Sequence, residues 1–251
     1  MNRETYTPGH RENATRFMAN RTLESHGQFF APYLEDGLDI LDIGCGPGTI
    51  SIGLANTSLK GKVIGVDFGD SQIEKARSNA KETGLTNLEF QVASCYELPF
   101  EDETFDRVFC HALMEHLARP VDMLSEAFRV LKPEGTIGIC SPDADGWLLS
   151  PPSRKLKDAI DAYISLQEAN GGNLRVEKHF GDLLEQAGFG EIEISARYEC
   201  YPSLVFIGEY LALQLADKDM HDHAQILRKW SESQNGMFAQ AWVAAVGRKN
   251  T

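Results

Sequence analysis

The sequence predicts an α/β fold, a sheet with helices on both faces, and two observations support this prediction. A short apolar run over residues 38–43 meets a glycine-rich bend and then a segment with helical apolar spacing, Thr49 to Asn56. Further strand-like runs, at 62–67, 88–92 and 104–111, alternate with helical patterns in the same way. Alternation of this kind is typical of α/β domains.

The bend after the first strand contains Gly44, Gly46 and Gly48. Glycines leave no Cβ in the turn, so a ligand can lie against bare backbone at a helix N-terminus, where amide donors point outward. The dinucleotide fingerprint is G-x-G-x-x-G, whereas here the third glycine comes one place early and Thr49 occupies its position. The spacing therefore weakens a NAD-binding interpretation, and on the loop alone a simple turn stays an alternative.

Composition limits the classes of function. With 251 residues, 42% of them apolar, the chain can form one large domain with a proper core. The net charge is −13 and the basic residues are scattered, which argues against a nucleic-acid partner. The five cysteines are widely spaced, as expected of reduced, buried thiols. No apolar stretch suits a leader or a membrane helix, so we expect a soluble, cytoplasmic protein with no membrane partner.

Before the first strand we expect an extended arm over residues 1–10, followed by an amphipathic helix or helix pair from Arg11 to Tyr33. Tyr6 lies on the arm, where it could close over a site as a lid and take part in catalysis.

The second strand, 62–67, ends in Asp67, roughly twenty residues after the first glycine, where nucleoside-binding units place the acid that binds the ribose. The alternative role for Asp67 is to cap the next helix, 71–83. Ser71-Gln72-Ile73-Glu74 forms a capping box that would take that role, which leaves Asp67 for a ligand.

Several motifs resemble those of class I S-adenosylmethionine-dependent methyltransferases. The first is Asp42-x-Gly44-x-Gly46-x-Gly48, and the others follow in the family's order: Leu98-Pro99-Phe100, Phe105-Asp106-x-Val108, Glu115-His116-Leu117 and Arg129 to Gly135. The resemblance implies a Rossmann-like seven-stranded sheet, S-adenosylmethionine as cofactor and S-adenosylhomocysteine as product. Among its subfamilies the chain resembles ubiquinone/menaquinone C-methyltransferases and glycine or sarcosine N-methyltransferases.

The resemblance also implies roles for residues. Arg21-Thr22-Leu23-Glu24 resembles a segment of glycine N-methyltransferases whose arginine holds the cofactor carboxylate, a role that suits a guanidinium group. Phe68 would pack on the adenine, and Ser94 stands where relatives carry an aspartate for the adenine amino group. The predicted cofactor-binding set is Arg21, Asp42, Gly44, Cys45, Gly46, Asp67, Phe68, Gln72, Ser94, Cys95 and His111.

The family motifs divide the chain into a core and a cap. We expect one domain over 1–251, whose core comprises 37–141, 178–197 and 238–249 and whose helical cap comprises 1–34, 143–176 and 201–236. The cap contains many aromatic residues, which favours a closed apolar pocket for a small-molecule substrate. Its helices could also pair two copies into a homo-oligomer.

Two histidines are candidates for a general base. His111 and His116 flank the end of the fourth strand and have ordinary pKa values near neutrality, although either could instead have a structural role. Cap residues that could approach a substrate are Asn173, Arg175 and His179.

A metal site is not predicted. His221 and His223 are two residues apart and would point to different faces of a helix, so the hydrophilic run around them is better explained as a solvated turn between helices.

The sequence therefore predicts methyl transfer to a small organic molecule, such as a secondary metabolite or a quinone-like compound, by in-line displacement. One alternative keeps the cofactor but uses it in a cyclisation or rearrangement. Another is a non-catalytic module or an enzyme that modifies proteins. The acceptor atom, whether N, O, S or C, stays open.

Overall fold

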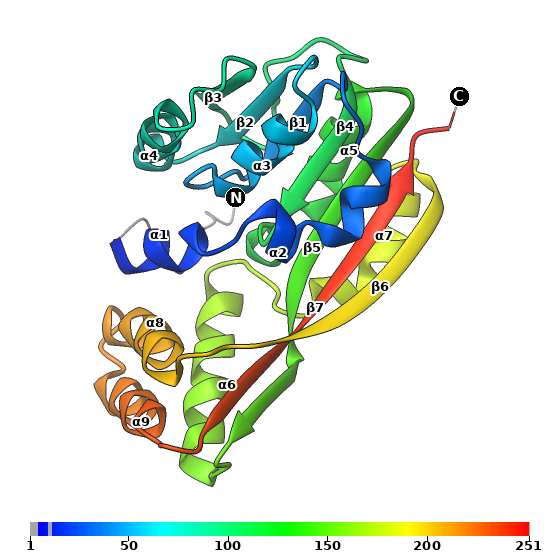
Figure 1. The fold of residues 1–251 in the computed structure, drawn as a ribbon. Helices are drawn as coiled ribbons and strands as arrows, with labels where there is room; N and C mark the ends of the chain where they lie inside the picture. The colour runs from blue at the N-terminus through cyan, green and yellow to red at the C-terminus, as the bar shows by residue number, and fades with distance from the viewer. Residues whose placement is uncertain (1–4, 10–11, 251) are drawn as a thin grey trace.

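The computed structural model describes residues 5–9 and 12–250. Within these residues the strands form one seven-stranded sheet in the order β3-β2-β1-β4-β5-β7-β6 (Figure 1). Strand β7 runs antiparallel to its two neighbours, and the other described pairs are parallel. The strands are β1 (Ile40–Ile43), β2 (Val63–Asp67), β3 (Leu88–Val92), β4 (Phe105–His111), β5 (Leu131–Ser150), β6 (Gly190–Cys200) and β7 (Met237–Arg248). The predicted α/β fold and its sheet are confirmed.

Helices connect these strands. They are α1 (Glu12–Ala19), α2 (Leu23–His26), η1 (Gln28–Tyr33), α3 (Thr49–Thr57), α4 (Asp70–Lys81), η2 (Met114–His116), α5 (Pro120–Val130), α6 (Arg154–Ala169), η3 (Val176–His179), α7 (Phe180–Gln186), α8 (Leu204–Ala216) and α9 (His221–Ser231). The amphipathic segment expected over 11–33 is thus three short helices rather than one or two.

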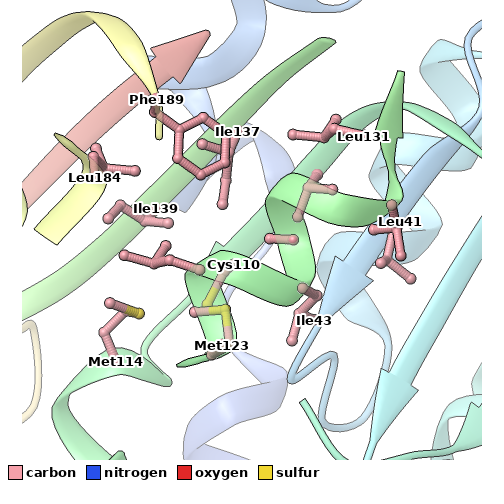
Figure 2. Close-up of a cluster of buried hydrophobic side chains, with 14 of the residues drawn as sticks. Leu41, Ile43, Cys110, Met114, Met123, Leu131, Ile137, Ile139, Leu184 and Phe189 are labelled. Atoms are coloured by element: carbon pink, nitrogen blue, oxygen red, sulfur yellow. The ribbon is translucent and has the colours of Figure 1, made fainter. Parts of the chain in front are cut away.

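Strand β1 is buried on both faces, as central parallel strands are. Because side chains alternate along a strand, Leu41 and Ile43 face the cluster that includes residues of α5 and α7. Ile40 faces the opposite cluster, together with Phe30 of η1 and Leu54 of α3. Figure 2 shows the first cluster, in which Leu41 and Ile43 lie near side chains of β4, β5 and α5. The carboxyl end of β1 is therefore fixed from both sides, and the glycine bend starts from a rigid position.

Strand β5 is longer than expected. The sequence suggested that it ends near Cys140 and that an insertion begins at Asp143, whereas β5 continues to Ser150. The continuation pairs with β7, with Leu148 opposite Ala239 and Ser150 opposite Met237, after a register shift that follows Asp143. A polar stretch interrupts the apolar pattern there, which hid the strand from sequence analysis.

The start of α4 also differs from the expectation. The helix begins at Asp70 after Gly69, and no side chain caps it, so the predicted capping box at Ser71 is wrong. Asp67 lies next to this terminus and accepts a hydrogen bond from the Gly69 N–H at 2.9 Å.

Helices α6, α8 and α9 gather around the extended ends of β5 and β7, away from β1, β2 and β3 (Figure 1). Their buried side chains form a cluster distinct from those of the sheet core, with Ile160 and Leu166 of α6, Leu211 of α8, Leu227 of α9 and Phe238 of β7. These helices correspond to the predicted cap. The division of 1–251 into core and cap segments stays a prediction.

Three of the five cysteines, Cys45, Cys110 and Cys140, are buried as expected, whereas Cys95 is half-buried and Cys200 is exposed. All five are free thiols. Within the described residues, no helix combines the length and the apolar character needed to cross a bilayer.

Candidate active site

A cavity of about 300 Å³ opens at the carboxyl ends of β1, β2 and β4. Ligands of open α/β sheets bind at this edge. The structure brings every residue of the predicted cofactor-binding and catalytic sets to its lining: Tyr6, Arg21, Asp42, Gly44, Cys45, Gly46, Asp67, Phe68, Gln72, Ser94, Cys95, His111 and His116.

The three glycines of the bend all have positive φ, +74° at Gly44, +52° at Gly46 and +77° at Gly48, which L side chains adopt with strain. Their surroundings differ. A Cβ on Gly48 would lie 2.6 Å from the Phe90 ring, so Gly48 allows close packing within the protein. A Cβ on Gly46 would meet nothing closer than the Met18 Sδ at 3.5 Å, so its bare backbone faces the cavity. Gly46 is therefore the position at which a ligand can approach the chain.

Asp67 is held by two backbone donors. Its Oδ2 accepts a hydrogen bond from the Gly46 N–H at 3.0 Å, and its Oδ1 accepts one from the Gly69 N–H at 2.9 Å. The sequence left Asp67 for a ligand, whereas in the structure its carboxylate also accepts these two backbone hydrogen bonds. A carboxylate oxygen can accept more than one hydrogen bond.

Asp42 lies behind the bend and is 2% exposed. Its Oδ2 accepts a hydrogen bond from the Ser51 Oγ at 2.5 Å, which ties β1 to α3. Burial raises the pKa of Asp42 to about 7, and the nearby charge of Asp67 acts in the same direction, against the Ser51 hydrogen bond. This carboxyl group is therefore close to half-protonated at neutral pH.

Arg21 stands at the cavity in the connection between α1 and α2. Its guanidinium carbon lies 5.0 Å from the Phe17 ring centroid and 5.1 Å from that of Trp242, within the range of cation–π contacts. Its backbone carbonyl accepts a hydrogen bond from the Thr49 Oγ1 at 2.6 Å, so the first residue of α3 fixes its position. A cation is thus placed beside the glycine bend, as the predicted carboxylate contact requires.

His111 ends β4 and is 7% exposed. Among the described residues, neither ring nitrogen has a hydrogen-bond partner. The ring packs on Trp242 with centroids 4.7 Å apart and on His26 with centroids 5.1 Å apart. Burial lowers the pKa of His111 well below its ordinary value, so the imidazole is neutral and can donate one hydrogen bond and accept another.

The predicted adenine end of the cavity is more open. Phe68 is 57% exposed. Its ring and the Tyr6 ring meet edge to face, with centroids 6.3 Å apart. The Ser94 Oγ accepts a hydrogen bond from the Tyr96 N–H at 3.2 Å, so the hydroxyl that stands in for the family aspartate is also engaged in a local turn.

Tyr6 also contacts His116, with ring centroids 4.8 Å apart. The Tyr6 hydroxyl donates to the Met18 Sδ at 3.6 Å, which holds the arm against α1. Burial lowers the pKa of His116 to about 4, so His116 is neutral and a weak proton acceptor at pH 7. A role for His116 as general base stays a prediction, and this environment disfavours it.

Other residues that the sequence singled out lie elsewhere. Arg175 forms ion pairs with Asp145 at 2.9 Å and Glu168 at 3.0 Å. Neither it nor Asn173 or His179 is among the described residues that line the cavity. His221 and His223 lie in the first turn of α9, not in the turn between helices that was expected. His221 is exposed, and its Nε2 lies 3.6 Å from the Asp219 Oδ1.

Sequence analysis missed Glu115 as a site residue. It precedes His116 in η2, is 2% exposed, and lines a second cavity of about 40 Å³ next to the first. The signal available in the sequence was a lone carboxylate within the apolar run Leu113-Met114-Glu115-His116-Leu117.

Comparison with known proteins identifies the family. The family model described as a methyltransferase domain matches residues 34–188, more than half of the chain. The chain belongs to the methyltransferase-domain family. Its sheet and strand order are those of the class I fold, and S-adenosylmethionine is the cofactor.

Three relatives illustrate the match. An uncharacterized methyltransferase of Schizosaccharomyces pombe is 38% identical over 131 residues, which cover 50% of this chain and 46% of that protein. The demethylmenaquinone methyltransferase of Lactococcus lactis is 38% identical over 102 residues, 40% of each chain. The solved phosphoethanolamine N-methyltransferase 2 of Haemonchus contortus, in complex with S-adenosyl-L-methionine, has a TM-score of 0.62 at 17% identity and covers 91% of this chain and 52% of its own. The chain thus spans about half the length of the curated relatives it matches.

The cavity fits this methyl donor. It has a bare backbone face at Gly46 and a carboxylate at Asp67 for the ribose hydroxyls, and the Arg21 cation suits the cofactor carboxylate. The Gln72 Oε1 is buried and has no hydrogen-bond partner among the described residues. It lies 4.0 Å from the point that a Cβ added to Gly46 would occupy. Such an unpaired acceptor is the kind of group that a bound molecule satisfies.

Proposed function

We propose that this chain transfers a methyl group from S-adenosylmethionine to a small organic molecule. The observation that supports it most is the cavity of about 300 Å³, which gathers all the predicted cofactor residues at the carboxyl edge of the sheet. Cavities of this size are typical of small-molecule sites.

Each group has a role in this proposal. Asp67 would hold the ribose, Arg21 the carboxylate, and the Gly46 backbone would lie along the methionine part. The neutral imidazole of His111 would donate or accept a hydrogen bond at the inner end of the cavity. When bound, the sulfonium supplies the methyl group, and the protein contributes orientation, which is worth on the order of 7 to 11 kcal/mol in well-aligned reactions.

The acceptor is proposed to be small because aromatic side chains line the cap side of the site. Tyr6 of the N-terminal arm lines both cavities, and α6 and α8 close the smaller one through Tyr163 and Tyr210. The similarity to demethylmenaquinone methyltransferase supports a quinone-like molecule as one candidate. This similarity covers only 40% of the chain, so it supports the proposed cofactor more strongly than it supports the identity of the acceptor.

Isothermal titration calorimetry with S-adenosylmethionine and, separately, S-adenosylhomocysteine tests the proposal. We expect both to bind with micromolar affinity. Candidate acceptors are then screened for formation of S-adenosylhomocysteine and a methylated product. Absence of binding by both compounds would overturn the proposal. Conversion of an acceptor without consumption of bound S-adenosylmethionine would instead favour the cyclisation or rearrangement alternative.

A further inference from the structure

The second cavity, of about 40 Å³, adjoins the first. The two share five lining residues: Tyr6, Met18, Arg21, Ala112 and His116. Most of the other lining residues come from the cap segments, and four of them are aromatic: Phe17, Trp147, Tyr163 and Tyr210. This cavity therefore lies between the cofactor residues and the cap, on the side from which an acceptor would be presented.

Among the residues that the structure describes, one carboxyl group lines this cavity, that of Glu115. Its Oε2 accepts a hydrogen bond from the Ser141 Oγ at 2.8 Å, and Ser141 is fully buried in β5. Its Oε1 lies 3.8 Å from the His116 Nε2, too far for a hydrogen bond. Ser141 thus fixes the orientation of the carboxyl group through one of its oxygens.

The protonation state of Glu115 suits proton transfer near neutral pH. Burial raises its pKa to about 7, against the opposing effects of the Ser141 hydrogen bond and the Arg21 charge. A base is most effective when its pKa lies near the working pH. His116, with a pKa of about 4, is a much weaker proton acceptor in the same cavity.

Trp147, a residue with an unpaired donor, lines the same cavity. The Trp147 Nε1–H is buried and has no hydrogen-bond partner among the described residues. The cavity therefore combines a carboxylate that can accept a proton, an indole N–H that can donate to an oxygen, and aromatic walls. Arg21 also lines it, and its positive charge disfavours a cationic amine.

We infer that this cavity receives the reacting hydroxyl of a flat, hydroxylated aromatic acceptor and that Glu115 is the catalytic residue that takes the hydroxyl proton. The inference rests on the proposed function. The proton goes to Glu115, and the acceptor oxygen keeps the electron pair and forms the new bond to the methyl carbon; the sulfonium supplies the methyl group and is left as a thioether. A volume of about 40 Å³ holds the hydroxyl and a few neighbouring atoms, so the remainder of the acceptor lies along the five shared residues.

The test uses 2-naphthol and 2-naphthylamine, two flat molecules that differ only in the reacting group. With the full chain and S-adenosylmethionine, we expect 2-naphthol to be methylated at least tenfold faster than 2-naphthylamine. In Glu115→Gln, the amide oxygen can still accept from Ser141 but the side chain takes no proton. We expect its kcat for 2-naphthol to fall at least a hundredfold, with KM within threefold, as for loss of a general base.

The pH profile gives a second measurement. In the wild-type protein kcat/KM rises with pH through about 7, because the ionised form of Glu115 is the base. In Glu115→Gln this rise disappears, and in Glu115→Asp part of the activity and the rise return. Glu177→Gln is the matched control, because Glu177 is also buried and its pKa is raised to about 8, yet it lies outside the described lining of both cavities. Its rate and pH profile stay those of the wild type.

A binding experiment gives a readout independent of turnover. Neutral 2-naphthol and its anion emit at different wavelengths, so its fluorescence on protein saturated with S-adenosylhomocysteine reports proton transfer. We expect anion emission with the wild type at pH 8 and neutral emission with Glu115→Gln. Equal emission in the two, equal pH profiles, faster methylation of 2-naphthylamine, or no binding of 2-naphthol would overturn the inference. Failure of S-adenosylhomocysteine itself to bind would instead overturn the proposed function.

Discussion

The cofactor half and the cap half of the molecule are built by different means. Around the glycine bend, the groups that face the cavity come from short consecutive stretches, and two backbone N–H groups fix the carboxylate of Asp67. Around the second cavity, side chains converge from α1, η2, β5, α6 and α8. The proposed cofactor site therefore depends on local backbone geometry, whereas the proposed acceptor site depends on side chains that only the tertiary fold brings together.

Gly48→Ala is the strongest test of the cofactor half, where backbone geometry shapes the cavity. A methyl group there combines a φ of +77° with a contact of 2.6 Å to Phe90. Backbone strain and overpacking together cost roughly 2 to 5 kcal/mol of the free energy of unfolding. Gly84→Ala is the control, because its φ is +72° but nothing lies within 4 Å, so only the strain remains. Urea denaturation measures both, and equal losses would show that packing at the bend contributes nothing.

Asp42→Asn tests the buried carboxyl beneath the bend. The folded protein binds the proton of Asp42 more tightly than the unfolded chain does, since its pKa is about 7 rather than 3.8. The protonated Asp42 carboxyl therefore makes its full contribution to the free energy of unfolding below pH 3.8, and this contribution is lost as the pH rises towards about 7. The wild type should lose on the order of 2 to 4 kcal/mol over this range relative to the variant. Denaturation curves from pH 4 to 8 measure the difference, and parallel curves would contradict it.

Asp67→Ala tests the chemistry of the same half. Loss of charged hydrogen bonds to the ribose should raise the Kd for S-adenosylmethionine at least tenfold, or about 1.4 kcal/mol. Calorimetry measures the affinity. Asp70→Ala, three residues further on at the start of α4, is a control that should bind as the wild type does. An unchanged Kd in Asp67→Ala would remove Asp67 from the cofactor site.

The smallest effect is expected on the cap surface. Arg228 of α9 and Glu209 of α8 form a two-bonded ion pair at 2.7 and 3.0 Å, but each side chain is 42% exposed. Exposed pairs contribute about 0 to 1 kcal/mol, so Arg228→Met should lower stability by less than about 1 kcal/mol and leave cofactor binding unchanged. A loss of cofactor affinity in this variant would show that the two halves are energetically coupled.

How well the structure could be predicted from the sequence also differs between the cofactor half and the cap half. The strand that ends at Ile43, the glycine bend and Asp67 were predictable because each is specified by adjacent residues. The continuation of β5 to Ser150 was not, because it depends on pairing with β7, almost a hundred residues away in the sequence. Glu115 was overlooked for a similar reason, since its burial and its contact with Ser141 exist only in the folded chain.

The long strands β5 and β7 bear on how such an enzyme can change its substrate. Each runs from the sheet core into the cap, and they pair on both sides of the register shift between Asp143 and Leu148. Recombination therefore could not exchange the cap as a separate unit, because the exchange would divide β5 and β7, the strands that complete the sheet. New acceptors would instead arise through point substitutions in the aromatic lining, within an architecture that stays fixed.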